Sequence, residues 1–447
     1  MKKIFFLLSL FFIVQSINAQ IEKKTTLPVP IPTLKIVQYP KSTRKFEKYE
    51  IDLFLKEFTG NPYNPEEIDI YAVFRNENTN EIYKVNAFYF KDYQFTCNNL
   101  PDGNHEYGSS QYEETFYESN NQNINWKIRF SPPSVGEWNF TIFYSLNQIS
   151  YHTINNNNFT CFNSSYHGII KKSNSKKNLI RDNQLFFPIG ENIERSPYSS
   201  YTLNCIDTHN KIGGICMFNK WLEELKSNNG NYIRFQTNAG FNSPSSLIYY
   251  NNNKPQQNFD IYLDNAFRID KYFEKAENLD IAIKFSIIKS DLLNETISSL
   301  WNNKNPWKIL LDKEGCSACS FFFNENAKKE FKNLLRYIIA RWGYSTQILA
   351  WELFDEVDLA KDETGSCINH ANIDMWFDEM KSEIKNLDPL NHLVSSGGFT
   401  SGGISWTEGI CPKFKIVDNM MGDDHSNNKV MLCQNHLKKE ITINHYG

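Results

Sequence analysis

Hydrophobic and polar residues alternate with a period of two in the first third of the chain. Residues 49–55 and 68–74 both show this alternation, which is typical of strands with one buried face. Residues 126–144 predict two strands joined by a turn that contains two prolines and a glycine. No part of residues 34–150 has a convincing helical period. The pattern therefore predicts an antiparallel β-sandwich of the immunoglobulin-like type over residues 34–150.

From about residue 168 the pattern changes to short apolar strands that alternate with amphipathic helices. This alternation is typical of β/α units and a parallel sheet. Strands are expected at residues 185–193, 231–237, 280–286, 348–354 and 392–396, and helices at residues 216–227, 259–278, 324–342 and 373–386. We therefore expect an α/β domain of the TIM-type (β/α)8 barrel class over residues 168–447, after a linker at residues 151–167.

The first 19 residues predict an export signal. Lys2 and Lys3 precede an apolar run over residues 4–14, and small and polar residues follow up to Ala19. A retained anchor is the alternative, but the run is too short to span a bilayer comfortably. Residues 20–33 form a linker that contains several prolines. The signal predicts a secreted protein that does not contact a membrane once the signal is cleaved.

Length, charge and composition narrow the classes of function. A chain of 447 residues suits two domains. The formal net charge is −4 and no block of basic residues occurs, which argues against nucleic acid as a partner. Aromatic residues make up 15% of the chain, which fits a protein that stacks sugar rings and equally fits two ordinary large cores.

Nine cysteines in an exported chain predict disulfide bonds. Cys205 and Cys216 are close enough in sequence for a local bridge. Cys316 and Cys319 have the spacing of a metal or redox pair, but no second pair follows, so we favour disulfide use. The nine histidines show no pair at ligand spacing beside an acid. We expect neither a metal nor a cofactor.

An apolar strand that runs into two adjacent acids is the strongest functional signal. Residues 348–354 precede Asp355 and Glu356. In a β/α barrel the carboxyl ends of the strands carry the chemistry, and a carboxylic acid with a raised pKa can donate a proton there. The alternative is a helix N-terminus, where carboxylates favour the helix dipole.

The surrounding residues resemble a known enzyme family. Residues 335–345 read LRYIIARWGYS and residues 351–358 read WELFDEVD. Both stretches are similar to the retaining, cellulase-like glycoside hydrolases of clan A that carry an N-terminal sandwich domain. Similar sandwich residues occur at 58–63, 88–90 and 129–138. The resemblance implies that Glu356 is the acid/base, that Asp355 stands where the family has Asn, and that the partner is a β-linked polysaccharide or oligosaccharide.

Several further residues are candidates for substrate contact. The resemblance places Arg234 where the related enzymes have an Arg that binds a catalytic carboxylate. The alternative is a buried Arg234 that pairs with Glu352, which alternation places on the same face as Glu356, and both interpretations can hold together. Asn192 and Glu191 end the first barrel strand and are candidates for contacts with sugar hydroxyls; a plain turn at residues 190–192 is the alternative. Trp406 follows the fifth strand and could stack on a sugar, whereas Trp351 is expected to pack in the barrel.

The end of the chain lacks the second carboxylate that a retaining glycosidase requires. The last strand resembles the family's seventh strand, with His445 in place of the nucleophile and Tyr446 beside it; a rival alignment makes it the sixth strand. A helix is expected at residues 429–438. The sequence therefore predicts a barrel that is incomplete at its C-terminus and a hydrolase with impaired chemistry. The alternatives are a non-catalytic glycan-binding relative and a truncated gene product.

Overall fold

The computed structural model describes most of the chain between residues 33 and 432. The described ranges are 33–99, 112–120, 123–149, 151–174, 178–193, 210–212, 214–237, 246–254, 259–297, 301–302, 305–367, 373–395, 421–424 and 429–432. The signal predicted at residues 1–19 lies outside these ranges. Within them, no helix is long and apolar enough to cross a membrane.

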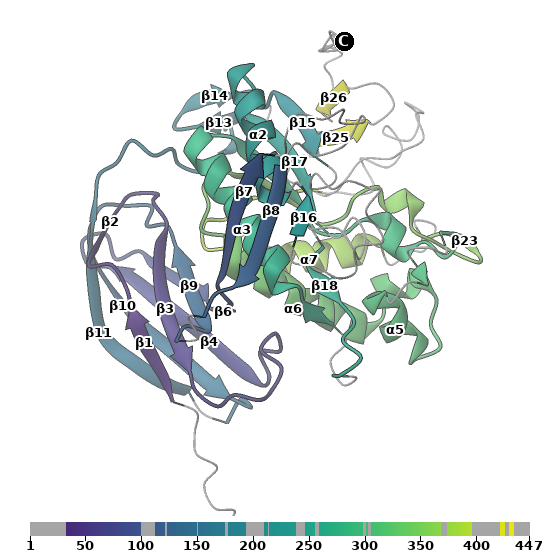
Figure 1. The fold of residues 1–447 in the computed structure, drawn as a ribbon, viewed down its shortest axis with the longest axis horizontal. Coiled ribbons are helices and arrows are strands. Elements are labelled where there is room, and N and C mark those ends of the chain that lie inside the picture. Colours follow the sequence, from purple (N-terminus) through teal and green to yellow (C-terminus); the bar gives the residue numbers. More distant parts are fainter. Residues whose placement is uncertain are drawn as a thin grey trace, which may run out of the picture.

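Two sheets form the N-terminal unit (Figure 1). The first sheet has the order β1 (Leu34–Gln38), β3 (Tyr49–Leu55), β9 (Trp126–Phe130) and β6 (Phe88–Tyr89). The second has the order β2 (Ser42–Arg44), β11 (Tyr151–Phe162), β10 (Gly136–Leu146), β4 (Ile68–Asn76) and β5 (Ile82–Asn86). All strand pairs are antiparallel except β2 with β11.

The two sheets pack on each other around an aromatic core. The rings of Phe74 in the second sheet and Phe130 in the first stack at 4.5 Å, and Trp138 is fully buried between them and Phe159. The alternation in the sequence therefore marks the buried faces correctly. The boundary differs from the prediction, because β11 occupies most of the linker predicted at residues 151–167 and extends this unit to Phe162.

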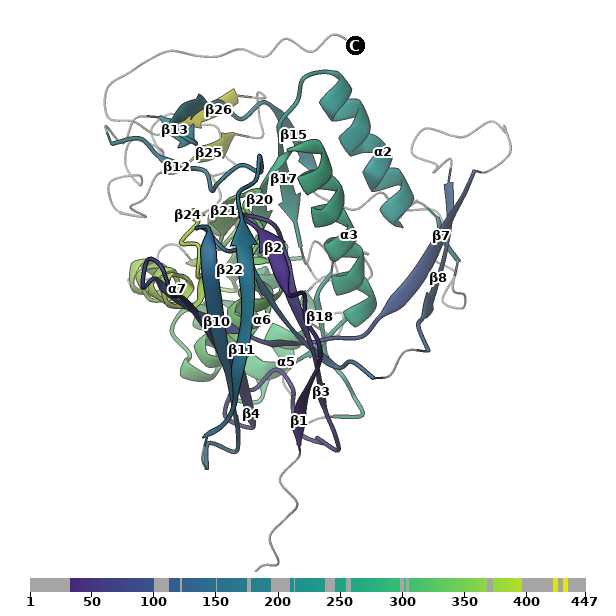
Figure 2. The same cartoon turned by 90° about the vertical axis from the view of Figure 1, so that its left-hand side faces the viewer.

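A parallel sheet of five strands forms the second part of the molecule (Figures 1 and 2). Its order follows the chain: β15 (Gly190–Ile193), β17 (Tyr232–Gln236), β20 (Ala282–Ser286), β21 (Ile348–Glu352) and β24 (Leu393–Ser395). The connecting helices are α2 (Gly214–Ser227), α3 (Leu263–Leu279), α5 (Pro306–Asp312), α6 (Glu325–Trp342) and α7 (Ile373–Leu387). This is the arrangement of successive β/α units in a barrel, and the described strands fit part of one.

Helix α6 shows how the sequence sets the position of these helices. The side chain of Asn324 caps its first turn by accepting a hydrogen bond from the Ala327 amide at 2.9 Å. Phe331, Leu335 and Ile338 recur at helical spacing and are buried against the sheet. Helix α6 ends at Trp342, before a Gly. The helix is followed by β21, which lies between β20 and β24 in the parallel sheet.

The parallel sheet has two different faces. Its outer face joins the helices in the largest apolar cluster of the molecule. Its inner face is apolar only near the start of the strands, where Tyr232 and Ala282 pack against Leu179. Leu179 belongs to a small sheet of β12 (Lys171–Lys172), β13 (Leu179–Arg181) and β14 (Gln184–Phe186). The single strand predicted at residues 185–193 is thus split into β14 and β15.

A hairpin of β7 (Tyr93–Asn99) and β8 (Tyr112–Glu118) links the N-terminal unit to α2. It pairs with β16 (Asn210–Ile212), and Figure 2 shows it extending away from the N-terminal sheets toward α2. Cys97 of β7 forms a disulfide with Cys216 of α2. The predicted bridge between Cys205 and Cys216 is therefore wrong, because the hairpin brings a cysteine 119 residues away in the sequence to α2.

The second disulfide joins Cys319 to Cys367. The preference for disulfide use over metal binding in the Cys316–Cys319 motif is therefore half confirmed, since Cys319 is bridged but not to Cys316. Cys316 and the buried Cys161 carry free thiols.

A buried ion cluster joins the N-terminal unit to the helices of the second part. The carboxylate of Asp270 in α3 accepts hydrogen bonds from Arg129 of β9 at 2.8 and 3.0 Å. It also accepts two from Arg341 of α6, at 2.9 and 2.8 Å, and one from the Trp342 indole at 2.9 Å. Burial by itself raises the pKa of Asp270, but the two guanidinium groups outweigh it and hold that pKa well below its usual range.

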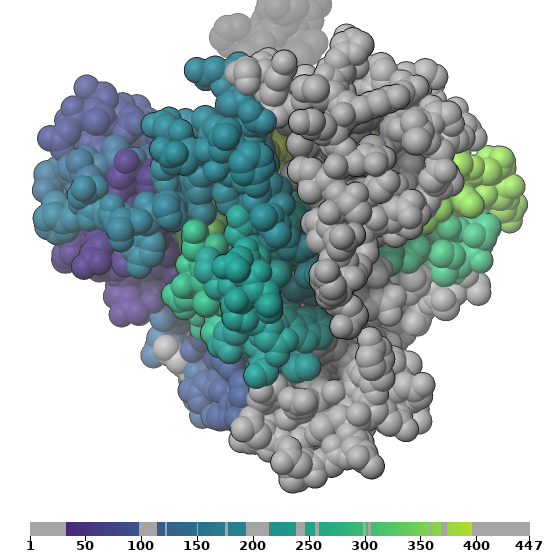
Figure 3. Space-filling view, turned by 90° about the horizontal axis from the view of Figure 1, so that it is seen from above, coloured from purple at the N-terminus to yellow at the C-terminus, as the bar shows by residue number. Residues whose placement is uncertain are grey.

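The last described strands are β25 (Met421–Asp424) and β26 (Lys429–Leu432), which form an antiparallel hairpin. The prediction of a helix that begins near residue 429 is therefore wrong for its first turn. Figure 3, viewed from above, shows the purple and blue atoms of the N-terminal unit on one side of the molecule and the yellow-green atoms of later segments on the opposite side.

Candidate functional site

Charged side chains meet on the inner face of the parallel sheet, near the carboxyl ends of three adjacent strands. Arg234 of β17 lies opposite Lys284 of β20 in the parallel register. Glu352 is the last residue of β21. It lies opposite Ser286, which is two residues beyond Lys284 in β20. Because residues of one face alternate along a strand, Arg234, Lys284 and Glu352 all point to the inside of the curled sheet.

Arg234 is the centre of this cluster. Its Nε donates a hydrogen bond to Oε2 of Glu352 at 2.7 Å, and its terminal nitrogen lies 2.5 Å from Oδ1 of Asp355. Lys284 lies 2.8 Å from Oε1 of Glu352. Gln236 donates to the second oxygen of Asp355 at 2.7 Å. The alternative interpretation, in which a buried Arg234 pairs with Glu352, is therefore confirmed.

All five of these side chains are buried, each with at most 3% of its surface exposed. The cluster holds two cations, Arg234 and Lys284, and two carboxylates, Glu352 and Asp355. Buried charges lose their hydration, and mutual pairing with good hydrogen-bond geometry offsets that loss. We call this set of five residues the Arg234 cluster.

Asp355 and Glu356 follow β21 in an irregular segment. Strand β21 ends at Glu352, and Asp355 instead forms an isolated parallel bridge with Lys289. Simple alternation placed Glu352 on the same face as Glu356, but in the structure Asp355 joins Glu352 at Arg234. The break of the strand after Glu352 causes this difference.

Glu356 has an unusual backbone conformation. Its φ is 49° and its ψ is 53°, in the left-handed region, and it begins the short 3₁₀ helix η4 (Val357–Leu359). Non-glycine residues seldom adopt this region, and such strain is often kept at functional sites. The side chain of Glu356 is partly buried, between the buried Asp355 and the buried Val357.

The other predicted contact residues divide into two groups. Asn192 is exposed on β15 and lies opposite Arg234 in the register, so it borders the Arg234 cluster. Trp406, His445 and Tyr446 lie outside the described residues. Trp351 packs in the core as expected, and its indole donates to Asp388 at 3.0 Å.

The sequence did not point to the polar layer that surrounds the cluster. Four inner residues share one level of the sheet: Gln236, Ser286, Glu352 and Ser395. Each is at most 2% exposed. Gln236, Ser286 and Ser395 each carry a buried side-chain oxygen without a hydrogen-bond partner among the described residues, whereas Oε1 of Glu352 faces Lys284. One signal was available, because Arg234, Gln236, Lys284 and Ser286 are polar residues at alternate positions in otherwise apolar strands.

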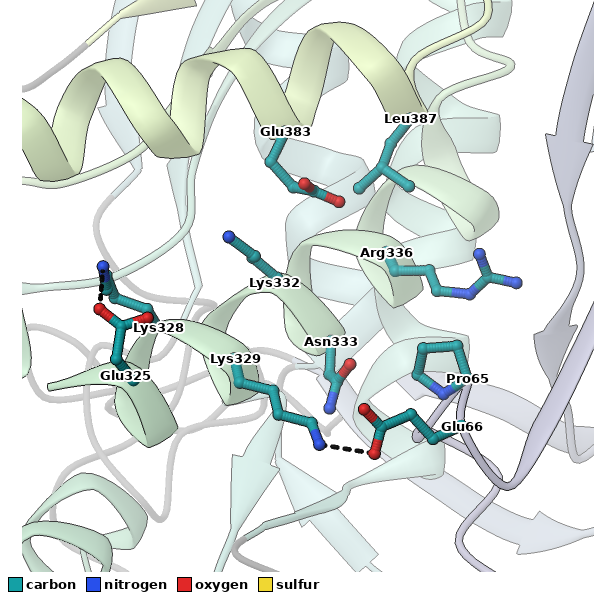
Figure 4. A pocket seen from close by; sticks show the side chains of 10 residues that line it. All are labelled: Pro65, Glu66, Glu325, Lys328, Lys329, Lys332, Asn333, Arg336, Glu383 and Leu387. Atoms are coloured by element: carbon teal, nitrogen blue, oxygen red, sulfur yellow. Dashed lines mark hydrogen bonds and ion pairs between the residues drawn. The ribbon is translucent and has the colours of Figure 1, made fainter. Parts of the chain in front are cut away.

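The polar groove drawn in Figure 4 is a different feature. It has a volume of about 310 Å³ and lies between α6, α7 and the Pro65–Glu66 segment of the N-terminal unit. Its cations are paired with acids, as in the ion pair of Lys329 with Glu66 at 2.6 Å. The groove lies on the outer face of α6, whereas the Arg234 cluster lies inside the sheet, so we do not assign the chemistry to it.

The described residues contain no group of three or more His, Cys, Asp or Glu side chains that could hold a metal ion. Beside the charge-balanced cluster, Glu356 offers the chemistry of a carboxylic acid. Such an acid can exchange a proton with a bound ligand if the ligand reaches it.

Comparisons with known proteins give partial similarity to glycoside hydrolases. No family model matches the chain. A 77-residue stretch is 35% identical to the probable mannan endo-1,4-beta-mannosidase C of Aspergillus terreus, and covers 16% of this chain and 19% of that protein.

Among solved structures, a candidate glycoside hydrolase from Bacteroides vulgatus is 16% identical, with a TM-score of 0.48; the match covers 82% of this chain and 58% of that one. The endo-1,4-beta-mannanase of Rhizomucor miehei is 18% identical, with a TM-score of 0.38, over 53% of this chain and 63% of that one. The chain thus spans less than two thirds of each of these proteins.

Proposed function

We propose that this chain is an exported glycoside-hydrolase-like protein of clan A that recognises β-linked glycans, with Glu356 as its acid/base residue. The observation that carries the proposal is the position of Glu356, next to the Arg234 cluster at the carboxyl ends of the parallel strands. That end of a β/α sheet is where enzymes of this architecture hold their substrates. The partial similarity to mannan-hydrolysing enzymes suggests β-1,4-mannan as the first glycan to test.

The proposed chemistry needs two carboxyl groups. In a retaining glycosidase one protonates the leaving oxygen and the other, roughly 5 Å away, attacks the sugar carbon. Glu356 fits the first role. Of the other acids of the site, Glu352 is held by Arg234 and Lys284, and Asp355 by Arg234 and Gln236. Neither is available for attack, so we infer that hydrolysis by this chain is impaired.

A glycan-binding protein without hydrolysis is the second candidate function. The occupied carboxylates favour it, because a site can bind sugar hydroxyls through Asn192 and Glu356 without forming a glycosyl intermediate. We propose in addition that the N-terminal unit is immunoglobulin-like and braces the barrel or contacts glycan. The two disulfides support an exported protein, since such bonds persist in oxidising compartments. Export with cleavage near Ala19 is tested by N-terminal sequencing of secreted material, which must not begin at Met1.

The test combines binding with hydrolysis. We expect residues 20–447 to bind β-1,4-mannan in affinity electrophoresis and to release negligible nitrophenol from a panel of aryl β-glycosides. Glu356→Gln, which keeps the shape of the side chain, serves as the matched variant. Failure to bind any β-linked glycan would refute the proposed function. Turnover by the wild type that disappears in Glu356→Gln would instead show an active hydrolase, and would make Asp423 and Asp424 the candidates for the second carboxylate.

A further inference from the structure

The balance of charge in the Arg234 cluster bears on the class of glycan that the site accepts. Two buried cations face two buried carboxylates, and both oxygens of Asp355 are engaged, one by Arg234 and one by Gln236. The backbone of Lys289 forms a bridge with that of Asp355. The side-chain nitrogen of Lys289 forms an ion pair with the carboxylate of Asp291 at 3.2 Å. Each described cation of this end of the sheet therefore already faces a carboxylate of the protein.

We propose that Asp355 is a specificity-determining residue that neutralises Arg234 and thereby excludes acidic sugars from the site. This inference rests on the proposed function. Without the carboxylate of Asp355, the cluster would carry one uncompensated positive charge in a medium of low dielectric, where charges act strongly and over longer distances than in water. When the Asp355 carboxylate is present, the Arg234 cluster carries no net charge, and an anionic sugar faces that neutral cluster and the acid Glu356.

The geometry explains why the effect of Asp355 reaches the ligand although Asp355 is buried. Asp355 and Glu356 are consecutive, and β21 has ended at Glu352, so both residues lie beyond the carboxyl end of the strand, where Asp355 forms a parallel bridge with Lys289. The hydrogen bonds from Arg234 and Gln236 fix the Asp355 side chain inward. Asp355 is thus a positioning residue that acts through Arg234, and we propose that Glu356 and Asn192 contact the substrate.

Two ligands that differ only in the group at C6 of each sugar, and thereby in charge, test the proposal. A β-1,4-linked mannose hexamer and a β-1,4-linked mannuronate hexamer share the backbone linkage, and the second has a carboxylate in place of each C6 hydroxymethyl group. Calorimetry should show the wild-type chain binding the mannuronate at least about tenfold more weakly. In Asp355→Asn the ratio between the dissociation constants of the two hexamers should fall by about tenfold, because Arg234 then attracts the anionic ligand.

Asp264→Asn is the matched control. Arg268 is as buried as Arg234 and is likewise paired with two acids, Glu114 and Asp264, but it lies against the β7–β8 hairpin. We expect this variant to bind both hexamers as the wild type does. If Asp264→Asn changed the ratio between the two dissociation constants as much as Asp355→Asn does, the effect would be a general one of charge, and the proposal would be overturned.

The affinities of the wild type for the two hexamers also test the proposal. If the wild type binds both hexamers within about twofold of each other, the inference is wrong and the proposed function stands. If it binds neither, the proposed function fails and the inference with it. Should Asp355→Asn not fold, salt dependence of the wild type decides: raising the salt from about 10 mM to about 0.5 M should strengthen mannuronate binding and leave mannose-hexamer binding unchanged. Mannuronate binding that is insensitive to salt would overturn the inference.

Discussion

Removal of the Asp270 carboxylate should loosen the contact between the N-terminal unit and the helices. In Asp270→Asn, the guanidinium groups of Arg129 and Arg341 keep their buried positions but lose the charge that compensates them. The five hydrogen bonds to this carboxylate come from β9, α6 and the indole of Trp342, so the change affects both parts of the molecule at once. An amide also directs an N–H group toward one of the donors.

The expected cost follows from the burial of the partners. Arg129 is 4% exposed and Arg341 is 0% exposed. Breaking a buried pair of this kind typically costs about 3–5 kcal/mol, because a charge is left uncompensated. For a chain of this size, with an unfolding entropy of about 2.1 cal/mol/K per residue, that corresponds to a fall in Tm of roughly 3–5 °C. Thermal and urea unfolding followed by circular dichroism give both quantities, and the loss of the bridge should separate the unfolding of the two parts into distinct transitions.

The pH dependence provides an independent check. Since the pKa of Asp270 is lower in the folded chain than in the unfolded chain, its stabilisation is fully present above the unfolded value of about 3.9 and is lost as the pH falls below it. The deficit of Asp270→Asn relative to the wild type should therefore be largest above about pH 5 and shrink in stronger acid.

A matched control is Glu66→Gln. Glu66 also joins the N-terminal unit to α6, through Lys329, but both side chains are about half exposed. This variant should lose no more than about 1 kcal/mol. An Asp270→Asn protein that unfolds within about 1 kcal/mol of the wild type at neutral pH would refute the reasoning, as would a deficit that does not depend on pH.

Three further changes have expected outcomes. Cys97→Ser with Cys216→Ser removes a bridge between residues 119 apart and should cost on the order of 4 kcal/mol, seen as a lower Tm that falls less on reduction than the wild-type Tm does, because only the Cys319–Cys367 bond is then left to break. Trp376→Ala removes a buried ring that contacts Phe331 and should cost about 3–5 kcal/mol in urea unfolding. Glu356→Gly relieves a left-handed backbone and should raise the unfolding free energy by about 0.5–1 kcal/mol while abolishing any proton transfer.

The sequence predicted the elements of the parallel sheet better than their ends. Strands β17, β20 and β21 and helices α2, α3, α6 and α7 all lie where periodicity placed them, because apolar runs of strand length alternate with amphipathic runs of helix length. Their bounds shifted by a few residues at the ends. The N-terminal strands followed from period-two alternation, but β11 was missed because its asparagine-rich sequence lacks a strong apolar pattern.

The candidate site was only partly predictable. Glu356 and Arg234 could be found, because an acid after an apolar strand and a lone Arg within one are local signals. The role of Asp355 could not, since it depends on where β21 ends and on which residue then turns inward. The disulfide between Cys97 and Cys216 could not be predicted from the sequence either, because it depends on the β7–β8 hairpin, which extends from the N-terminal unit to α2.

The left-handed backbone at Glu356 bears on the role that we propose for this residue. On its N-terminal side Asp355 is fixed by Arg234 and Gln236, and on its C-terminal side Val357 is buried in the core. Between these two anchors the backbone of Glu356 is forced into the left-handed region, which costs a non-glycine residue roughly 1 kcal/mol. Glycine would avoid that cost. A glutamate at this position therefore gives up some stability, which supports the proposed role of Glu356 as the acid/base residue.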